Sequence, residues 1–378
     1  MERYIKQGVF KDLNRKMVFV GGPRQVGKTT FAKNLLETWP DQLSSTVQRY
    51  YSWDDDRDRE FLLAKQLPFS PGPVILDELH KYQRWRWLLK ALYDKRGNEL
   101  QILVTGSAKL DYYRRGGDSL QGRYHYYRLH PLSLKELSSQ TTSSLRDLLM
   151  YGGFPEPFFS ASETETRRWS REYRSRVLRE ELRDLEKVND ISLIERMAIR
   201  LPTLVGNPLS LNALREDLQV SHQTVVRWMN MLERLYSIFR IYPFGAPHIR
   251  AVKKEAKHYH FDWAQIPETG FRFENMIACH LLKWCHFFED TEGWDMDLRY
   301  FRDTDKREVD FVVLKERTPI LFVECKISFQ EASGHLKYLS RKFPGVEAVQ
   351  IHFDGDEDIK TDEGIRLCPA ATFLKRFV

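Results

Sequence analysis

The sequence predicts an α/β protein of several domains, the first of which contains a parallel sheet. Three observations predict this class. A short apolar run leads into a glycine-rich loop, and two further apolar runs follow it and end in polar residues. Much later in the chain, two apolar runs joined by a polar turn indicate a β-hairpin that carries charged residues. The 378 residues are enough for two or three domains, each with its own hydrophobic core.

The first element is a strand at 17–20 that ends in a phosphate-binding loop. Residues 21–30 read Gly-Gly-Pro-Arg-Gln-Val-Gly-Lys-Thr-Thr, and 22–29 fit the pattern G-x-x-x-x-G-K-[ST]. The glycines allow a tight turn whose backbone N–H groups point at phosphate oxygens, near the positive end of the following helix. Lys28 should reach the β- and γ-phosphates of ATP, and the Thr29 hydroxyl should bind Mg²⁺. The predicted ATP-binding residues are Gly22, Pro23, Arg24, Gln25, Val26, Gly27, Lys28, Thr29 and Thr30.

The next predicted strand, 73–76, ends in two carboxylates about fifty residues after Lys28. A buried parallel strand that ends in Asp77-Glu78 is typical of the second half of such a nucleotide site. Asp77 would hold the hydrated Mg²⁺, and Glu78 would orient and deprotonate the attacking water. An acidic pair that only caps a loop is the alternative interpretation.

A third strand, 100–104, is followed by Thr105-Gly106-Ser107. A small polar residue at this place would lie between Glu78 and the γ-phosphate and hold the attacking water. We expect Ser107 to have that role in preference to Thr105. A simple turn is the alternative.

A fourth strand, 124–129, follows Arg123 at the edge of the predicted sheet. An arginine at an edge could project into the site of a neighbouring subunit and neutralise charge in the transition state. We therefore predict self-association, with Arg123 acting in trans. Arg114, Arg115 and Arg128 compete for this role, and an arginine that only solvates a loop is a further alternative.

Together these motifs resemble the AAA+ ATPases, and more narrowly the prokaryotic AAA_14-type proteins that carry a C-terminal DUF4143 domain. The resemblance rests on Gly-Gly-Pro-Arg-Gln-Val-Gly-Lys-Thr-Thr, Leu-Asp-Glu-Leu-His, Val-Thr-Gly-Ser-Ala, Gly-Arg-Tyr with Leu-His-Pro-Leu-Ser, and Tyr-Gly-Gly-Phe-Pro-Glu at 151–156. It implies an ATPase core at 1–150 and a helical lid at 151–200. Glycine and proline hinges at the start of the lid would also suit the movement of a nucleotide switch.

Inside the expected lid, residues 167–187 are rich in charge. Apolar residues recur there at helical spacing, so most of the charges should line a solvated helix face. Arg179 or Arg183 could in addition contact the nucleotide of a neighbouring subunit.

Residues 201–250 are predicted to form a winged helix-turn-helix. A short helix capped by Ser210, a turn, a second helix capped by Ser221 and a strand at 238–242 follow one another. Residues 222–260 contain seven Lys or Arg and two Glu, an excess that suits contact with DNA phosphates. Winged helices also dock proteins, so protein docking is the alternative to DNA binding. The side chains predicted to face a DNA groove are His222, Gln223, Thr224 and Arg227.

Residues 251–378 are predicted to form an α/β domain whose hairpin joins 307–314 to 320–326. Asp310 on the first strand and Glu324 with Lys326 on the second resemble the core of PD-(D/E)xK nucleases, a restriction-endonuclease-like fold. The resemblance implies that Asp310, Glu324 and, from the preceding helix, Glu274 hold Mg²⁺ or Mn²⁺, and that Lys326 acts on the hydrolytic water. Alternate residues of a strand share a face, so Glu324 and Lys326 should point the same way. A buried Glu–Lys ion pair without catalysis is the alternative.

Composition excludes several classes of protein. No apolar run approaches the roughly 18 residues of a membrane span, so no membrane partner is expected. Four cysteines without C-x-x-C spacing argue against a zinc site or a disulfide framework and favour the cytoplasm. A net charge of +6 permits a nucleic-acid partner without requiring one.

Two functions fit these features. The first is a Mg²⁺-dependent ATPase associated with DNA, with a winged-helix reader and a metal-dependent nuclease domain. The second is a nucleotide-controlled switch or scaffold whose nuclease-fold domain is inactive and serves binding or oligomerisation.

Overall fold

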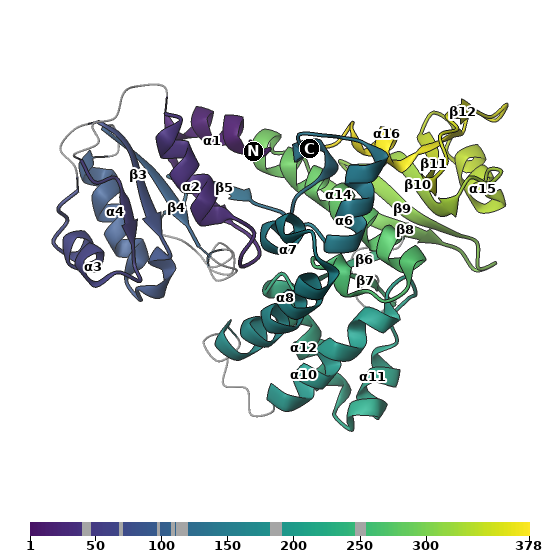
Figure 1. The fold of residues 1–378 in the computed structure, drawn as a ribbon, viewed down its shortest axis with the longest axis horizontal. Coiled ribbons are helices and arrows are strands. Elements are labelled where there is room, and N and C mark those ends of the chain that lie inside the picture. Colours follow the sequence, from purple (N-terminus) through teal and green to yellow (C-terminus); the bar gives the residue numbers. More distant parts are fainter. Residues whose placement is uncertain are drawn as a thin grey trace. The chain divides into compact units, whose positions relative to one another are not determined.

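The computed structural model describes residues 1–39, 47–67, 71–96, 99–106, 110, 120–181, 191–245 and 255–378. These residues fall into two compact units, Met1–Pro131 and Leu132–Val378 (Figure 1). The first unit thus ends before the boundary that we expected at residue 150. Long-range hydrogen bonds hold residues 132–150 to the rest of the second unit. Lys283 Nζ donates to Ser133 Oγ at 2.8 Å, and Leu134 N–H donates to His280 Nε2 at 3.2 Å.

Within the described residues, the first unit contains a five-stranded parallel sheet in the order β2-β3-β4-β1-β5. β1 and β3 are buried along their whole length, as parallel strands are when helices cover both faces of the sheet. This is the parallel α/β sheet that the sequence predicts. Its strands are β1 Met17–Gly21, β2 Tyr50–Ser52, β3 Gly72–Asp77, β4 Leu100–Thr105 and β5 Tyr124–Arg128, and its helices are α1 Lys6–Leu13, α2 Lys28–Glu37, α3 Asp56–Leu63 and α4 Trp85–Arg96.

The register of this sheet brings the carboxyl ends of three strands to one edge. Val20 of β1 pairs with Thr105 of β4, and Thr105 pairs with Asp77 of β3. The three strands therefore end level, with β4 in the middle. Because the P-loop follows β1 and Glu78 follows β3, the strand order places the two nucleotide motifs on either side of Thr105.

The second unit begins with helices. The predicted caps are present: the Ser210 hydroxyl accepts the Ala213 N–H at the start of α11, and the Ser221 hydroxyl accepts the Thr224 N–H at the start of α12. The helices are α6 Thr142–Tyr151, α7 Pro155–Ser160, α8 Glu163–Arg176, α10 Ile191–Arg200, α11 Leu211–Leu218 and α12 His222–Arg234, and the turn η4 Val177–Glu181 extends α8.

The rest of the second unit is built on a mixed sheet that has eight strands in the described residues, in the order β12-β13-β11-β10-β9-β8-β6-β7. Its core on one face contains Val312, Phe322, Leu336 and Leu339. The strands are β6 Ile238–Pro243, β7 Lys257–His260, β8 Met296–Arg302, β9 Glu308–Lys315, β10 Thr318–Ser328, β11 Glu347–Asp354, β12 Ile359–Lys360 and β13 Arg366–Pro369, and the helices are α14 Thr269–Glu292, α15 Gly334–Lys342 and α16 Ala370–Leu374.

β6 is the strand that we expected to begin a wing. It forms a hairpin with β7, in which Ile238 lies opposite His260. Its far end also pairs with β8, where Tyr242 lies opposite Arg299. The sheet therefore continues across the domain boundary expected between residues 250 and 251, and the helix-turn-helix segment shares one sheet with the C-terminal domain.

The expectations about membrane spans and cysteines can be compared with the structure. In the described part of the chain, no helix has a stretch long and apolar enough to cross a membrane. The four cysteines are free thiols, of which Cys279, Cys285 and Cys368 are buried.

Candidate functional site

Asp77, at the carboxyl end of β3, is the centre of a buried polar network in the first unit. Its Oδ2 accepts hydrogen bonds from Thr29 Oγ1 at 2.8 Å and from the Tyr50 hydroxyl at 2.6 Å. Its Oδ1 accepts a hydrogen bond from the Thr105 hydroxyl. Thr29 and Asp77, the two residues predicted to hold Mg²⁺, thus lie side by side although 48 positions separate them. A hydroxyl and a carboxylate in contact supply the oxygen ligands that Mg²⁺ prefers, so these residues fit the ion.

The P-loop has the backbone geometry that its glycines allow. Gly22 has a φ of +136°, and a Cβ there would lie 2.3 Å from the Leu129 carbonyl oxygen. Gly27 has a φ of 97° and precedes the first residue of α2, Lys28. The Lys28 Nζ donates to the carbonyl oxygens of Gly22 at 3.1 Å and of Pro23 at 2.6 Å. The ammonium group therefore lies over the loop, where it would meet an anion held by the backbone N–H groups.

A residue that no motif predicts holds this loop in place. Arg3 is buried, and its guanidinium donates to the carbonyl oxygen of Val26 at 2.9 Å and to that of His130. The neighbouring Tyr4 hydroxyl donates to the Arg128 carbonyl oxygen. The P-loop is thereby tied to the end of β5. These hydrogen bonds are accepted by backbone carbonyls, which every residue has. The side chains at the accepting positions therefore give no sign of them in the sequence.

Glu78 follows Asp77 in a conformation that non-glycine residues rarely adopt, with a φ of 55° in the left-handed region. Its Oε2 lies 3.6 Å from His80 Nε2 and 3.7 Å from Lys81 Nζ. Burial raises the pKa of Glu78, and the positive charges of Lys28 and Lys81 oppose that rise. A carboxylate whose pKa is raised towards neutrality is a better proton acceptor, which suits the predicted role of general base.

The end of β4 completes the surroundings of Glu78. Gly106 lets His80 approach closely, because a Cβ at this position would lie 2.6 Å from His80 Nδ1. Ser107, which we predicted to hold the attacking water, lies outside the described residues. The hydroxyl of Thr105, the alternative to Ser107, donates a hydrogen bond to Asp77. Thr105 therefore belongs to the polar network around Asp77.

A second polar cluster lies in the second unit around Lys257, the first residue of β7. Lys257 is 1% exposed, and its Nζ lies 2.6 Å from Glu308 Oε1, 3.3 Å from Glu274 Oε1 and 4.0 Å from Asp310 Oδ1. The Tyr259 hydroxyl donates to Glu274 Oε1 at 2.6 Å. No sequence motif marks Lys257, because an isolated lysine in a basic segment gives no sign of burial.

The strand β10 borders this cluster. Glu324 and Lys326 lie on one face of the strand, and Lys326 Nζ donates to Glu324 Oε1 at 2.9 Å. The intervening Cys325 N–H donates to Asp310 Oδ2 at 2.8 Å. Burial, followed by the charge of Asp310, raises the pKa of Glu324 to about 8 and that of Glu274 to about 7. The carboxylates are thus crowded and poorly solvated, and lysines supply the balancing charge.

Models of known protein families match the chain at both sites. The model of an AAA domain (AAA_14) matches residues 14–138, and the model of the domain of unknown function DUF4143 matches residues 269–373. The chain thus carries an AAA-type domain and, further along, a DUF4143-type domain. A further domain of unknown function, DUF8612, matches residues 142–265 between them. The predicted resemblance to AAA_14-type proteins with a DUF4143 domain is therefore confirmed at these two regions.

Two similar proteins cover 64% and 95% of this chain. An uncharacterized protein of Mycobacterium tuberculosis, Rv2008c, is 25% identical over 64% of this chain and 53% of its own length. The chain thus spans about half the length of this relative. The uncharacterized protein MJ1637 of Methanocaldococcus jannaschii is 20% identical over 95% of this chain and 85% of its own length.

Two solved structures show a distant likeness to this chain. The Orc1 protein of Aeropyrum pernix in complex with DNA is 12% identical and gives a TM-score of 0.34, over 69% of this chain and 90% of that chain. The DNA clamp loader delta protein of Bacillus subtilis is 12% identical and gives a TM-score of 0.30, over 61% of this chain and 88% of that chain.

Arg123 does not lie at the nucleotide motifs of its own AAA domain. It precedes β5, whose first residue pairs with Met17 and whose last residue pairs with Gly21. The P-loop follows Gly21, so Arg123 lies at the opposite end of the strands, about 17 Å away along them. Its Nε donates to Asp94 Oδ1 at 3.0 Å. The competing Arg128 lies at the P-loop end of β5, whereas Arg114 and Arg115 are outside the described residues.

The predicted metal ligands of the DUF4143 domain lie near one another and beside two lysines. Among the residues that the structure describes, no group of three or more His, Cys, Asp or Glu side chains is placed to hold a metal ion. Glu274 and Asp310 instead surround the ammonium of Lys257, and Glu324 binds Lys326. The expectation of Mg²⁺ or Mn²⁺ at these residues is therefore not supported, because buried ammonium groups already supply the positive charge.

The helix α12 presents a polar face to solvent. Its apolar face is buried through Val225, Trp228, Met229 and Leu232. Thr224 is engaged in the cap, with its hydroxyl 2.8 Å from Ser221 Oγ. A groove along this helix is lined by the buried Met231 and by His222, Gln223, Val226, Arg227, Asn230 and Arg234.

Proposed function

We propose that this protein is a Mg²⁺-dependent ATPase. The observation that carries the proposal is the contact between the Thr29 hydroxyl and the Asp77 carboxylate beside Lys28. Thr29 and Asp77 would hold Mg²⁺, which neutralises charge on the phosphates when bound. Lys28 and the backbone N–H groups of the P-loop bind the β- and γ-phosphates. Glu78 orients a water molecule and accepts its proton as the terminal phosphate is transferred.

Lys28→Ala tests the site directly. We expect the dissociation constant for ATP to rise by about one to two orders of magnitude, because each hydrogen bond to a charged phosphate is worth about 1.5–3 kcal/mol. Fluorescent ATP titration would measure this change, and ATP hydrolysis should be lost with it at ordinary ATP concentrations. Lys11→Ala, in an exposed part of α1, is the matched control. Unchanged ATP affinity in Lys28→Ala would refute the assignment of the loop.

The exposed face of α12 suits duplex DNA. Arg227 and Arg234 lie on that face beside polar side chains that can hydrogen-bond to base edges. The helix begins at a cap, and Arg240 steadies it from β6 through hydrogen bonds to Asn230 at 2.7 Å and Glu233 at 2.6 Å. A rigid helix with an exposed cationic face is what insertion into a DNA groove requires. We therefore place DNA binding on α12, and protein docking on the same face remains the alternative.

Arg227→Ala should weaken DNA binding and reduce the slope of log K against log salt by about one, because one phosphate contact is lost. Fluorescence anisotropy with a labelled duplex at several salt concentrations would measure both quantities. Lys360→Ala removes an equally exposed cation from β12 and should change neither. If Arg227→Ala retains the wild-type affinity and salt slope, α12 does not contact DNA.

Self-association would give Arg123 a role. At the sheet edge opposite its own P-loop, it can serve only the nucleotide of another subunit. We expect Arg123→Ala and Glu78→Gln proteins to be inactive separately and to regain part of the ATPase activity when mixed, because each subunit supplies what the other lacks. A mixture as inactive as its components would remove Arg123 from catalysis.

For the DUF4143 domain we favour a binding or assembly role over nuclease activity. The arrangement of Lys257 among carboxylates supports this choice, since it leaves no cluster of free acidic ligands in the described residues. In the proposed function, the ATPase therefore controls a module that binds rather than cuts.

A further inference from the structure

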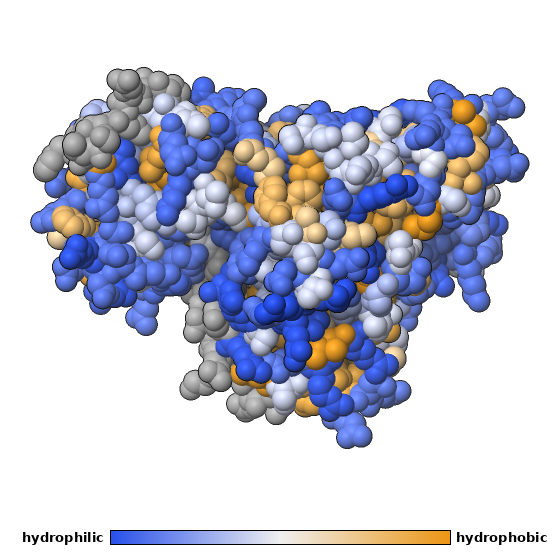
Figure 2. Space-filling view, in the orientation of Figure 1, coloured by the Kyte–Doolittle hydropathy of each residue, from blue (hydrophilic) through white to orange (hydrophobic). Residues whose placement is uncertain are grey.

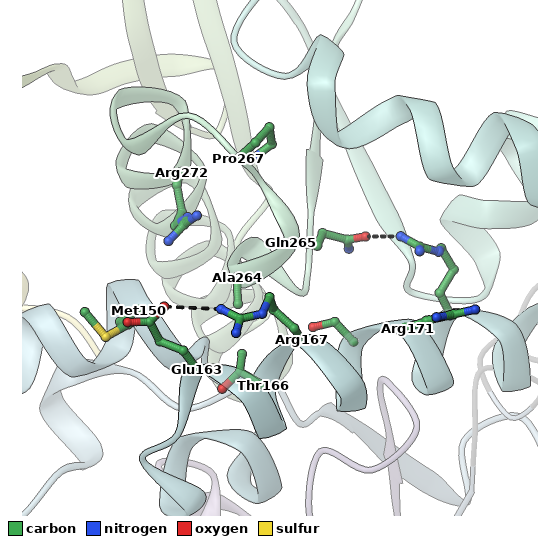
Figure 3. Close-up of a pocket in the computed structure, with 11 residues that line it drawn as sticks. Met150, Glu163, Thr166, Arg167, Arg171, Ala264, Gln265, Pro267 and Arg272 are labelled. Atoms are coloured by element: carbon green, nitrogen blue, oxygen red, sulfur yellow. Dashed lines mark hydrogen bonds and ion pairs between the residues drawn. The ribbon is translucent and has the colours of Figure 1, made fainter.

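A pocket of about 340 Å³ lies in the second unit between α8 and the segment that leads from η6, Trp263–Gln265, into α14 (Figure 3). Four arginines line it, namely Arg167, Arg171, Arg174 and Arg272, together with one acidic residue, Glu163. The proposed ATPase and DNA-binding functions do not use this pocket.

The three arginines of α8 share one face of the helix, because positions 167, 171 and 174 are separated by four and three residues. The other face is fixed by aromatic packing. Trp169 and Tyr173 stack with ring centroids 4.7 Å apart, and Phe154 lies 4.8 Å from the first ring and 5.0 Å from the second. This packing sets the rotation of α8 and so aims its arginines at the pocket before any ligand is present.

Arginines from both sides are also held by hydrogen bonds. Arg174 Nη1 donates to Gln265 Oε1 at 3.2 Å, and Arg272 Nε donates to the Ile266 carbonyl oxygen at 2.7 Å. The bond from Arg272 uses neither of its terminal nitrogens, and Figure 3 shows this side chain and Arg167 directed towards the same space. Burial lowers the pKa of Arg174 and of Arg272, so both charges are incompletely solvated.

The balance of charge in the pocket is positive. Glu163 lies 3.3 Å from Arg167 and offsets one of the four cations. Asp262, which is 3% exposed, lies near Arg174 and Arg272. Glu163 and Glu268 also lie near Arg272. Figure 2 shows a strongly hydrophilic surface over α8. Four arginines around one concave site, two of them held by hydrogen bonds, favour an anionic ligand.

We propose that this pocket binds a small anion that carries a diphosphate or triphosphate group, at a site separate from the P-loop. Guanidinium groups bind phosphate oxygens through paired hydrogen bonds, which an ammonium group cannot form. The volume lies near the lower end of the range for small-molecule sites and suits one such group with part of its carrier.

Inorganic pyrophosphate is the probe, and the full-length Lys28→Ala protein removes the P-loop as a competing site. Isothermal titration calorimetry should show saturable pyrophosphate binding to this protein. Adding Arg171→Gln or Arg272→Gln should weaken that binding about tenfold or more. Glu163→Gln should strengthen it, because Arg167 loses its competing carboxylate.

Arg168→Gln is the matched control, since Arg168 lies on the same helix but pairs with Glu165 at 3.1 Å. No pyrophosphate binding to the Lys28→Ala protein, or an equal loss in the control, would overturn the proposal. So would unchanged affinity in Arg171→Gln, and because Arg171 is exposed, this variant decides the question even if Arg272→Gln fails to fold. A short single-stranded oligonucleotide that binds through Arg171 in the absence of pyrophosphate binding would assign the pocket to nucleic acid instead.

Discussion

Glu78→Gln is expected to lower the rate of ATP hydrolysis by about two to four orders of magnitude while ATP still binds. Glutamine has the shape of glutamate but cannot accept the proton of the attacking water. The backbone φ of 55° and the nearby His80 and Lys81 side chains should keep the residue in place after the substitution. Turnover under saturating ATP and Mg²⁺, together with the dissociation constant for ATP, would separate catalysis from binding.

Glu60→Gln, on the exposed side of α3, is the control for the loss of a carboxylate as such and should hydrolyse ATP at the wild-type rate. The pH dependence provides a second readout. Because burial raises the pKa of Glu78, the wild-type rate should begin to fall at a higher pH than an ordinary glutamate would cause. Glu78→Gln should lose this acid limb. Turnover near that of the wild type would assign the base to another residue.

Lys257→Met is expected to destabilise the DUF4143 domain by about 3–5 kcal/mol, the cost of removing one partner from a buried ion pair. The substitution leaves Glu274, Glu308 and Asp310 crowded together without their shared cation. Their repulsion is relieved only when they bind protons, so the destabilisation should shrink at low pH. Denaturant unfolding at several pH values would measure the free energy of unfolding.

Lys360→Met, which changes an exposed lysine of the same unit, should alter that free energy by less than about 0.5 kcal/mol. A cation from solution could replace the missing ammonium, so Mn²⁺ should stabilise the Lys257→Met protein and have little effect on the wild type. Equal stabilisation of both proteins by Mn²⁺ would mean that the native domain holds a metal after all. That outcome would restore the nuclease interpretation.

The nucleotide site was predictable because each of its motifs consists of consecutive residues. A glycine-rich loop after an apolar run predicts the backbone conformation of a P-loop. Asp77-Glu78 at the end of another apolar run predicts the end of a strand. In a parallel sheet the carboxyl ends of the strands lie at the same edge, so the two motifs come together whatever sequence connects them. The Thr29–Asp77 contact therefore follows almost directly from the two motifs.

The parts of the site that were missed depend on residues without a local pattern. Tyr50 reaches Asp77 only because β2 lies next to β3, and Arg3 reaches the P-loop only through backbone acceptors. In the second unit, the pattern of Asp310, Glu324 and Lys326 correctly indicated a charged hairpin but not its counter-ion. Lys257, about fifty residues before Asp310, supplies the buried ammonium group beside that carboxylate.

By itself, the sequence determined the P-loop, the strand that ends in two carboxylates, the capped helix α12 and the charged hairpin, because each is specified by neighbouring residues. Only the tertiary structure decided that β6 joins the C-terminal sheet, that Lys257 is buried among carboxylates and that arginines of α8 and α14 meet in one pocket. The physical reason is that burial and charge balance depend on which distant segments pack together. The sequence alone does not distinguish a lysine or arginine that faces water from one that faces a buried carboxylate or an anion site.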